Sequence, residues 1–341
     1  MATIPANRPL VVIAFPPMAR PRWVENFGEA FPEVEIIAVS YDEPMEMRLA
    51  RGRGDTIALA ERPPLSAEQA DAFARAEVIL AFDVPTDMGS LAPNLRWVQQ
   101  IGAGVDHLNG AALGPDVAVT SATGISAVPI AEFVMGRLLA VWKQFGELDA
   151  AQREHRWVQL YGRRFAGSTV AIIGLGAIGT EVAIRAQSFG ARVLGVRRRA
   201  DLAPPPGVAE VYPPSALHDV LAQADAVVVA APAGDETRNL FDEASFAAMK
   251  PGAVFCNVAR GSLVDEAALI SALESGQVGA AILDVTVLEP LPEEDPLWSA
   301  PNIHLSAHCS TVVSDYLDQL AELFSDNLRR YLRQEPMRNL V

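Results

Sequence analysis

The chain has 341 residues, half of them hydrophobic and a fifth charged, so it can bury the cores of two ordinary domains. No long basic run offsets its net charge of −15, which makes nucleic acid and anionic membranes poor partners. The two cysteines, Cys256 and Cys309, lack the spacing of a metal site or a disulfide framework, and we expect neither. Because no stretch is as long as a membrane span and the N-terminus resembles a strand rather than a signal peptide, we expect a soluble, cytoplasmic protein.

The first third of the chain alternates short apolar runs with helical stretches, which predicts a parallel, doubly wound sheet. We expect strands at residues 10–15, 34–39, 78–81, 95–99 and 117–120, and helices at 22–30 and 66–75. The segment 44–64, rich in Arg, Pro and Gly, is predicted to be a loop.

Residues 125–143 are apolar on most sides, so they predict a long helix buried between domains or against another subunit. We expect strands after it at 169–173, 192–196, 226–230, 253–258, 280–284 and 303–306. Six strands with intervening helices are typical of a Rossmann domain. A last amphipathic helix, 314–332, follows them and is free to return to the first domain.

These patterns predict an α/β fold with two doubly wound parallel-sheet domains. A dinucleotide-binding Rossmann domain, residues 121–311, is inserted into a discontinuous flavodoxin-like substrate domain, residues 1–120 and 312–341.

The stretch from Val170 to Gly179 is the strongest motif in the chain. Four apolar residues predict a buried strand, and the glycines of the G-x-G-x-x-G turn that follows lead into a helix. Gly174 allows the tight turn, Gly176 lets a pyrophosphate approach the backbone, and Gly179 lets the helix pack on the strand. The helix N-terminus then faces the phosphates. We predict a dinucleotide site, with an ordinary tight turn as the alternative.

The end of the next predicted strand indicates which dinucleotide binds. Enzymes that use NAD usually carry an acidic residue there, whereas this chain has Arg197 and Arg198, and no acid before Asp201. Arginine can pair with the 2′-phosphate of NADP. We therefore expect NADP(H) as the preferred cofactor, with NAD(H) possible and a solvated basic turn as the alternative.

Three ionisable residues follow successive predicted strands. Arg260, Glu289 and His308 come from loops at the carboxyl ends of those strands, where an open parallel sheet binds its ligand. A planar arginine can bind the oxygens of a 2-keto acid and polarise its carbonyl. An imidazole suits proton delivery to the growing alkoxide, and a carboxylate on its other nitrogen would fix the tautomer. Taken singly, each residue could instead be a surface charge or a satisfied core histidine.

The chain also resembles the D-isomer-specific 2-hydroxyacid dehydrogenase family, in the glyoxylate/hydroxypyruvate reductase-like branch. The resemblance extends from about Trp97 onward and is carried by five runs in the family's order: 101–109 (IGAGVDHLN), 124–132, 257–266, 283–298 and 301–308.

The resemblance implies residue roles. The family's catalytic arginine falls on Arg260, its proton-donating histidine on His308 and the paired glutamate on Glu289. Its substrate-carboxylate loop falls on Gly102, Ala103 and Gly104, where small residues leave the backbone N–H groups open to an anion. Asp284 matches a family aspartate near the site, and Cys309, beside the histidine, is expected to serve packing. The expected cofactor-binding residues are Gly174, Gly176, Ala177, Ile178, Gly179, Arg197, Arg198, Ala231, Pro232, Val258, Ala259 and Asp284.

We therefore predict NADPH-dependent reduction of a small 2-keto acid to the D-2-hydroxy acid, with glyoxylate, hydroxypyruvate and arylpyruvates as candidate substrates. Glu289 disfavours a formate-dehydrogenase-like reaction, which needs no proton donor. The alternative from another class is a nucleotide-sensing, corepressor-like scaffold that uses the same fold to bind proteins. The apolar segment 125–143 and the family resemblance together suggest a homodimer.

Overall fold

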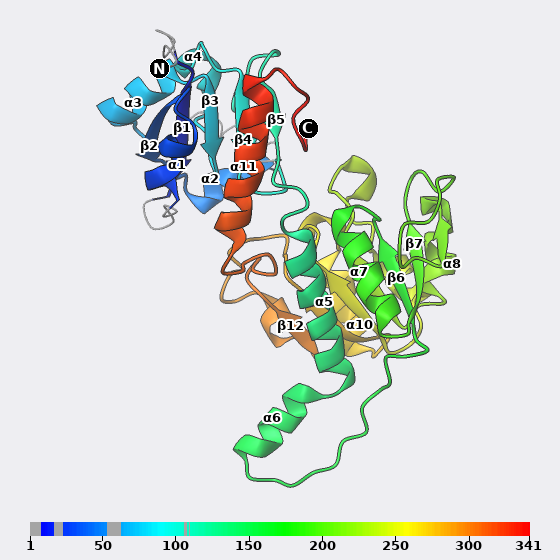
Figure 1. Cartoon of the computed structure of the whole chain (residues 1–341). Coiled ribbons are helices and arrows are strands. Elements are labelled where there is room, and N and C mark those ends of the chain that lie inside the picture. Colours follow the sequence, from blue (N-terminus) through cyan, green and yellow to red (C-terminus); the bar gives the residue numbers. More distant parts are fainter. Residues whose placement is uncertain (1–7, 17–22, 53–62, 106–107, 109) are drawn as a thin grey trace. The chain divides into compact units, whose positions relative to one another are not determined.

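The computed structural model describes residues 8–16, 23–52, 63–105, 108 and 110–341. The chain divides into two compact units (Figure 1). Unit 1 comprises Met1–Ile125 and Val313–Val341, and unit 2 comprises Ser126–Val312. The sequence predicted the two domain boundaries after residues 120 and 311, whereas the units divide after residues 125 and 312.

Unit 1 contains a five-stranded parallel sheet. Its strand order is β2-β1-β3-β4-β5, the order of flavodoxin-like folds. The strands are β1 (Leu10–Phe15), β2 (Glu35–Ser40), β3 (Val78–Ala81), β4 (Trp97–Gln100) and β5 (Ala118–Thr120). All five predicted strands are confirmed. β1, β3 and β4 are fully buried, whereas β2 and β5 are short runs that are only partly buried.

Helices cover both faces of this sheet. On one face, α1 (Val24–Ala30) and α11 (Tyr316–Leu332) bury their apolar sides, and Phe324 of α11 packs against Phe27 and Trp97. On the other face lie α3 (Ala67–Arg75) and α4 (Met88–Leu91). The first predicted helix is confirmed from residue 24, the second almost to the residue, and α11 confirms that the chain returns to this unit.

The loop predicted for residues 44–64 is wrong over its first part. Residues Met45–Gly52 form α2, because good helix formers follow Pro44, a residue that suits a helix start. The part at 53–62 lies outside the described residues.

Unit 2 contains a seven-stranded parallel sheet of order β12-β11-β10-β9-β6-β7-β8. The strands are β6 (Thr169–Ile173), β7 (Arg192–Val196), β8 (Glu210–Tyr212), β9 (Ala226–Val229), β10 (Ala253–Asn257), β11 (Val278–Leu283) and β12 (Ile303–Leu305). The six predicted strands are present, but the predicted count is wrong by one. The sequence missed β8, a three-residue edge strand that is too short and too polar to show a pattern.

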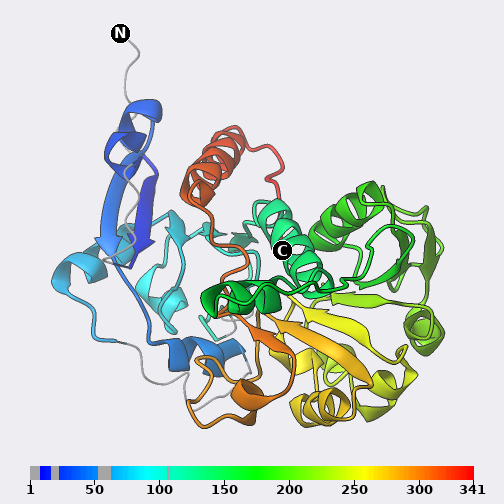
Figure 2. The same cartoon turned by 90° about the horizontal axis from the view of Figure 1, so that it is seen from below.

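Helices cover both faces of the second sheet as well (Figures 1 and 2). On one face, α5 (Ala127–Trp142) packs against α7 (Ala177–Ser188) and the sheet. The other face carries α8 (Leu217–Leu221), α9 (Glu243–Ala248) and α10 (Glu266–Glu274). The apolar segment 125–143 therefore forms a helix, as predicted, and the side chains that α5 buries pack within unit 2.

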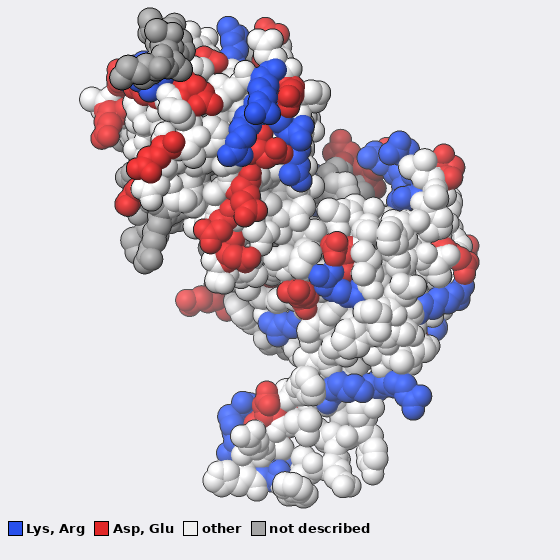
Figure 3. Space-filling model, in the orientation of Figure 1, with Lys and Arg blue, Asp and Glu red and all other residues white. Residues whose placement is uncertain are grey.

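Residues 144–164 form a projection, here called the arm, which the sequence did not predict. It consists of α6 (Phe145–Arg153) and an irregular return segment. Its base is held by two contacts of Arg163, whose N–H donates to the Trp142 carbonyl at 2.6 Å and whose side chain pairs with Asp225 at 2.8 Å. Figure 3 shows this lower projection as a largely uncharged surface with a few arginines and acids. Within the described part of the chain, the helices are all too short or too polar to cross a membrane.

Candidate active site

The Arg–Glu–His set lies at one edge of the unit 2 sheet. Arg260 follows β10, Glu289 lies in the loop after β11, and His308 follows β12. These three strands are neighbours and run parallel, so their carboxyl ends meet at the same edge. The fold therefore gathers there the three residues that the sequence singled out.

His308 and Glu289 form a hydrogen-bonded pair. His308 Nδ1 lies 2.9 Å from Glu289 Oε2, and the other carboxylate oxygen accepts the Thr286 N–H at 3.1 Å. The histidine side chain is 46% exposed and that of the glutamate only 20%, so the carboxylate anchors an imidazole that reaches solvent. Among the described residues, no partner occupies His308 Nε2. The pair thus holds one ring nitrogen and leaves the other open for proton transfer.

Asp284 shapes the loop that carries His308. Its carboxylate is buried and accepts hydrogen bonds from Ser306 Oγ at 2.7 Å and from the N–H groups of Cys309 and Ser310 at 3.0 and 3.1 Å. Its backbone carbonyl accepts the His308 N–H at 2.8 Å. The sequence placed Asp284 among the cofactor-binding residues, whereas the structure uses its oxygens to hold the histidine loop. Cys309 is exposed, so its expected packing role is wrong.

The Arg260 loop is shaped in a similar way. The Asn257 side chain donates to the Arg260 carbonyl at 2.8 Å and accepts from the Ala259 N–H at 3.0 Å. A Cβ on Gly261 would lie 2.0 Å from the Thr286 carbonyl carbon. Only glycine allows this approach, which brings the arginine loop against the loop that contains Glu289.

Glu266 is a supporting residue that the sequence named only as part of a motif. It is the first residue of α10, and its Oε1 accepts the Val287 N–H at 2.7 Å. Burial raises the pKa of this carboxyl, although the Val287 N–H acts in the opposite direction. Its sequence signal, an acid at a helix start, is too common to reveal the role.

The glycine loop has the spacing that a dinucleotide needs. Gly174 has φ +100°, and a Cβ there would meet the Ala231 nitrogen at 2.6 Å, while one on Gly179 would lie 2.0 Å from the Gly174 carbonyl oxygen. A Cβ on Gly176 would meet nothing within 4 Å. Two glycines therefore permit close packing, and the third leaves open space at the N-terminus of the 12-residue helix α7. Ala177 and Ile178 form the first turn of that helix.

The remaining predicted cofactor residues lie at the carboxyl edge of the sheet. The strand order reverses between β6 and β9, the position where doubly wound sheets bind ligands. Ala231 and Pro232 follow β9, and the buried Val258 and Ala259 follow β10.

The two arginines after β7 differ in their surroundings. Arg197 Nη2 donates to the carbonyls of Leu202 and Ala203, at 2.6 and 2.9 Å, and so holds its own loop together. Arg198 is exposed, with no partner among the described residues. Arg198 is therefore better placed than Arg197 to meet a phosphate.

In unit 1, the Gly102–Gly104 loop follows β4. The Ile101 carbonyl accepts the Tyr316 hydroxyl at 2.6 Å, and the Gly102 carbonyl accepts the Ala122 N–H at 2.9 Å. Within the described residues, the three N–H groups of Gly102, Ala103 and Gly104 have no acceptor. Successive unpaired N–H groups of this kind can bind an anion. Residues 106, 107 and 109 of the same motif lie outside the described part.

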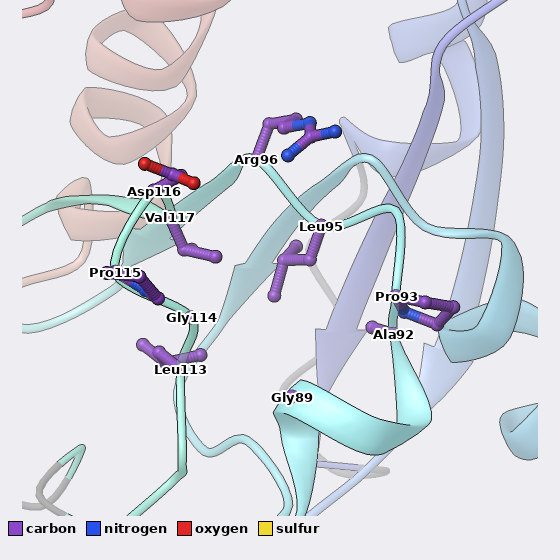
Figure 4. A pocket seen from close by; sticks show the side chains of 10 residues that line it. All are labelled: Gly89, Ala92, Pro93, Leu95, Arg96, Leu113, Gly114, Pro115, Asp116 and Val117. Carbon is purple, nitrogen blue, oxygen red and sulfur yellow. The ribbon is translucent and has the colours of Figure 1, made fainter.

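A separate small hollow of about 120 Å³ lies in unit 1 between α4 and the turn before β5 (Figure 4). Arg96, immediately before β4, and Asp116, two residues before β5, line it. It therefore lies at the amino ends of these strands, opposite the Gly102–Gly104 loop, and is not part of the same site.

Comparison with known proteins agrees with this geometry. Residues 135–310 match the family model of the D-isomer specific 2-hydroxyacid dehydrogenase NAD binding domain. A glyoxylate reductase of Korarchaeum cryptofilum is 32% identical over 272 residues, which cover 77% of this chain and 81% of that protein.

Solved structures give the same result over nearly the whole chain. A D-isomer specific 2-hydroxyacid dehydrogenase of Xanthobacter autotrophicus, in complex with NADPH and MES, is 29% identical with a TM-score of 0.77 and 97% coverage of both chains. An NADPH-dependent glyoxylate/hydroxypyruvate reductase of Sinorhizobium meliloti, in complex with NADP and sulfate, is 28% identical with a TM-score of 0.77 and 98% coverage of both.

The fold and the site together define a nicotinamide-dependent oxidoreductase of the doubly wound α/β class. The chain belongs to the D-isomer specific 2-hydroxyacid dehydrogenase family and is an NAD(P)-dependent enzyme of that kind.

Proposed function

We propose that this enzyme reduces a small 2-keto acid to the D-2-hydroxy acid with NADPH. The observation that carries the proposal is the 2.9 Å pair of His308 and Glu289, with the arginine loop packed against the glutamate loop through Gly261. An oriented imidazole and an arginine at the same edge of the sheet suit a reaction that polarises a carbonyl and protonates an alkoxide. Glyoxylate and hydroxypyruvate, named for the relatives, are the first candidate substrates.

The residues present fit a dinucleotide. The open space beside Gly176 and the close packing at Gly174 and Gly179 leave room for a pyrophosphate at the α7 N-terminus. Ala231, Pro232, Val258 and Ala259 would lie along the rest of the molecule. When bound, the nicotinamide supplies a hydride to the substrate carbonyl.

The side chains of this protein then have separate roles. Arg260 binds the substrate and draws electron density toward the carbonyl oxygen, which favours attack at the carbon. His308 donates a proton from Nε2 to that oxygen as it becomes an alkoxide. Glu289 keeps Nδ1 protonated and stabilises the imidazolium form. The Gly102–Gly104 loop binds the substrate carboxylate through its backbone N–H groups.

A preference for NADPH over NADH is part of the proposal. It is supported by the exposed Arg198 after β7 and by the lack of an acid before Asp201. Arg197 acts beside it by holding the loop in place.

The test is a panel of 2-keto acids run with both cofactors. We expect at least one acid to be reduced with NADPH, with a kcat/KM for NADPH about tenfold or more above that for NADH. Chiral analysis should give the D-product, and His308→Gln should remove most of the rate. Faster turnover with NADH contradicts the cofactor preference. A wild-type protein that reduces no acid in a broad panel favours the nucleotide-sensing scaffold instead.

We also propose a homodimer, formed through the arm rather than through α5. Trp157 and Tyr161 are 99% and 91% exposed, and Phe145 is half exposed, a costly arrangement for a segment that stays in water. Residues 144–164 hold four arginines against three carboxylates in a chain of net charge −15, so they are electrostatically suited to a second copy. Light scattering at micromolar concentration should give twice the chain mass of 36.5 kDa. A monomer would contradict this proposal.

A further inference from the structure

The Gly102–Gly104 loop would bind an anion through its backbone N–H groups, and two of its three residues are glycines. Contacts from outside the loop must therefore set its shape. Glycine populates many backbone conformations, and a glycine-rich loop does not hold its N–H groups in one direction by itself. Tyr316 contacts Ile101, the residue that precedes the loop, and Asn339 contacts the segment around Ala122, which in turn contacts Gly102. This remote support carries the inference.

The Tyr316 hydroxyl fixes the first peptide unit of the loop. It donates to the Ile101 carbonyl at 2.6 Å from the first residue of α11. The Ile101 C=O and the Gly102 N–H belong to one planar trans peptide, in which the two groups point in opposite directions. By holding the carbonyl, Tyr316 therefore also fixes the direction of the Gly102 N–H.

The next peptide unit is fixed in the same manner. The Ala122 N–H donates to the Gly102 carbonyl at 2.9 Å, which sets the direction of the Ala103 N–H. The segment around Ala122 is itself held by the C-terminus. Asn339 Nδ2 donates to the carbonyls of Ser121 and Thr123, at 3.2 and 2.7 Å, and the Asn339 carbonyl accepts the Ser121 N–H at 3.0 Å.

We propose that the C-terminal segment, residues 313–341, positions the Gly102–Gly104 loop to bind the substrate carboxylate. Tyr316 is the direct positioning residue and Asn339 acts one link further away, through Ala122. The inference rests on the proposed function, because it assigns the ligand of the loop as a carboxylate. It adds a role for α11 beyond packing on the unit 1 sheet, because this helix would also set the anion-binding conformation of the loop.

The chain offers a matched control on the same helix. The Tyr331 hydroxyl donates to Glu77 Oε1 at 2.6 Å, and both tyrosines are half-buried. Tyr331→Phe therefore deletes a comparable hydrogen bond from α11 at a position that does not contact the loop. A general weakening of the helix would weaken substrate binding in Tyr316→Phe and Tyr331→Phe alike. A positioning role predicts weaker binding in Tyr316→Phe alone.

The experiment compares Tyr316→Phe, Asn339→Ala and Tyr331→Phe with wild type. We expect Tyr316→Phe to raise the KM for the 2-keto acid about fivefold to tenfold, with kcat and the KM for NADPH within about twofold, because the lost interaction serves ground state and transition state equally. Oxamate, an unreactive analogue, should bind the NADPH complex of Tyr316→Phe more weakly by the same factor in calorimetry. Asn339→Ala should show a smaller change in the same direction, and Tyr331→Phe none.

Two results contradict the inference in different ways. If Tyr316→Phe keeps wild-type KM and oxamate affinity, or if Tyr331→Phe reproduces its losses, the positioning role is wrong while the proposed function stands. If wild type neither reduces a 2-keto acid nor binds oxamate, both proposals fall together.

Discussion

The side chains proposed to carry the chemistry and the loop proposed to bind the carboxylate are held in different ways. In unit 2, three side chains on neighbouring strand ends carry the chemistry, and buried polar groups of the same loops, chiefly Asp284 and Asn257, hold them. In unit 1, the binding element is bare backbone at Gly102–Gly104, held by Tyr316 and, through Ala122, by Asn339. Proton transfer needs particular side chains, whereas anion binding needs only N–H groups in a fixed direction.

This difference predicts different kinetic signatures for lost support. A residue that holds the histidine loop should affect kcat, because the proton donor must be oriented in the transition state. A residue that holds the backbone loop should affect KM, because binding is lost in both states. The variants below either sharpen that contrast or remove it.

Among the residues that support the two loops, the largest effect is expected for Asp284→Asn. Asparagine keeps one acceptor oxygen, but its amide N–H₂ would face the Ser310 N–H in place of Asp284 Oδ2, so the loop that carries His308 should shift. We expect kcat to fall about thirtyfold, with NADPH binding by fluorescence within about twofold.

Asp242→Asn is the matched control for that substitution. Asp242 caps α9 by accepting the Ser245 N–H at 2.9 Å, and an asparagine can keep this bond. We expect it to cost at most about 1 kcal/mol of stability and to leave kcat unchanged. If Asp284→Asn instead raises KM with kcat intact, the contrast between the histidine loop and the backbone loop is wrong.

A smaller effect is expected for Arg198→Ala, which tests whether unit 2 also contributes a purely binding contact. Loss of a charge-assisted hydrogen bond to the 2′-phosphate should raise the KM for NADPH about tenfold and leave that for NADH within about twofold. Arg199→Ala is the control, because Arg199 is an equally exposed neighbour. If Arg198→Ala raises the KM for NADPH and NADH equally, or if Arg199→Ala shows the same loss, Arg198 does not bind the 2′-phosphate.

Sequence patterns predicted most of the fold because the strands are buried apolar runs that end in turn residues. The failures occur where that signal is absent. The edge strand β8 has three residues, α2 lies in a segment dominated by Arg, Pro and Gly, and α6 projects from the body of unit 2 with half-exposed Phe145 and Leu148. Short or poorly buried elements leave little periodicity to detect.

The same distinction holds for the site. Arg260, Glu289 and His308 could be named from the sequence because their chemistry is tied to their residue type, and the strand order then brings them to one edge. The residues that position them could not be named from the sequence. Tyr316 is an ordinary helical tyrosine until the fold places its hydroxyl on Ile101, and Gly261 shows its close approach only once Thr286 lies beside it.

The most direct test of the central claim, that His308 delivers the proton, is the kcat of His308→Gln measured together with its affinity for NADPH. General acid catalysis contributes about 10²–10⁴-fold, so kcat for 2-keto acid reduction should fall about a thousandfold while NADPH binding stays within about twofold. A variant that keeps kcat within about tenfold of wild type would show that another group supplies the proton, and the assignment of the pair with Glu289 would be wrong.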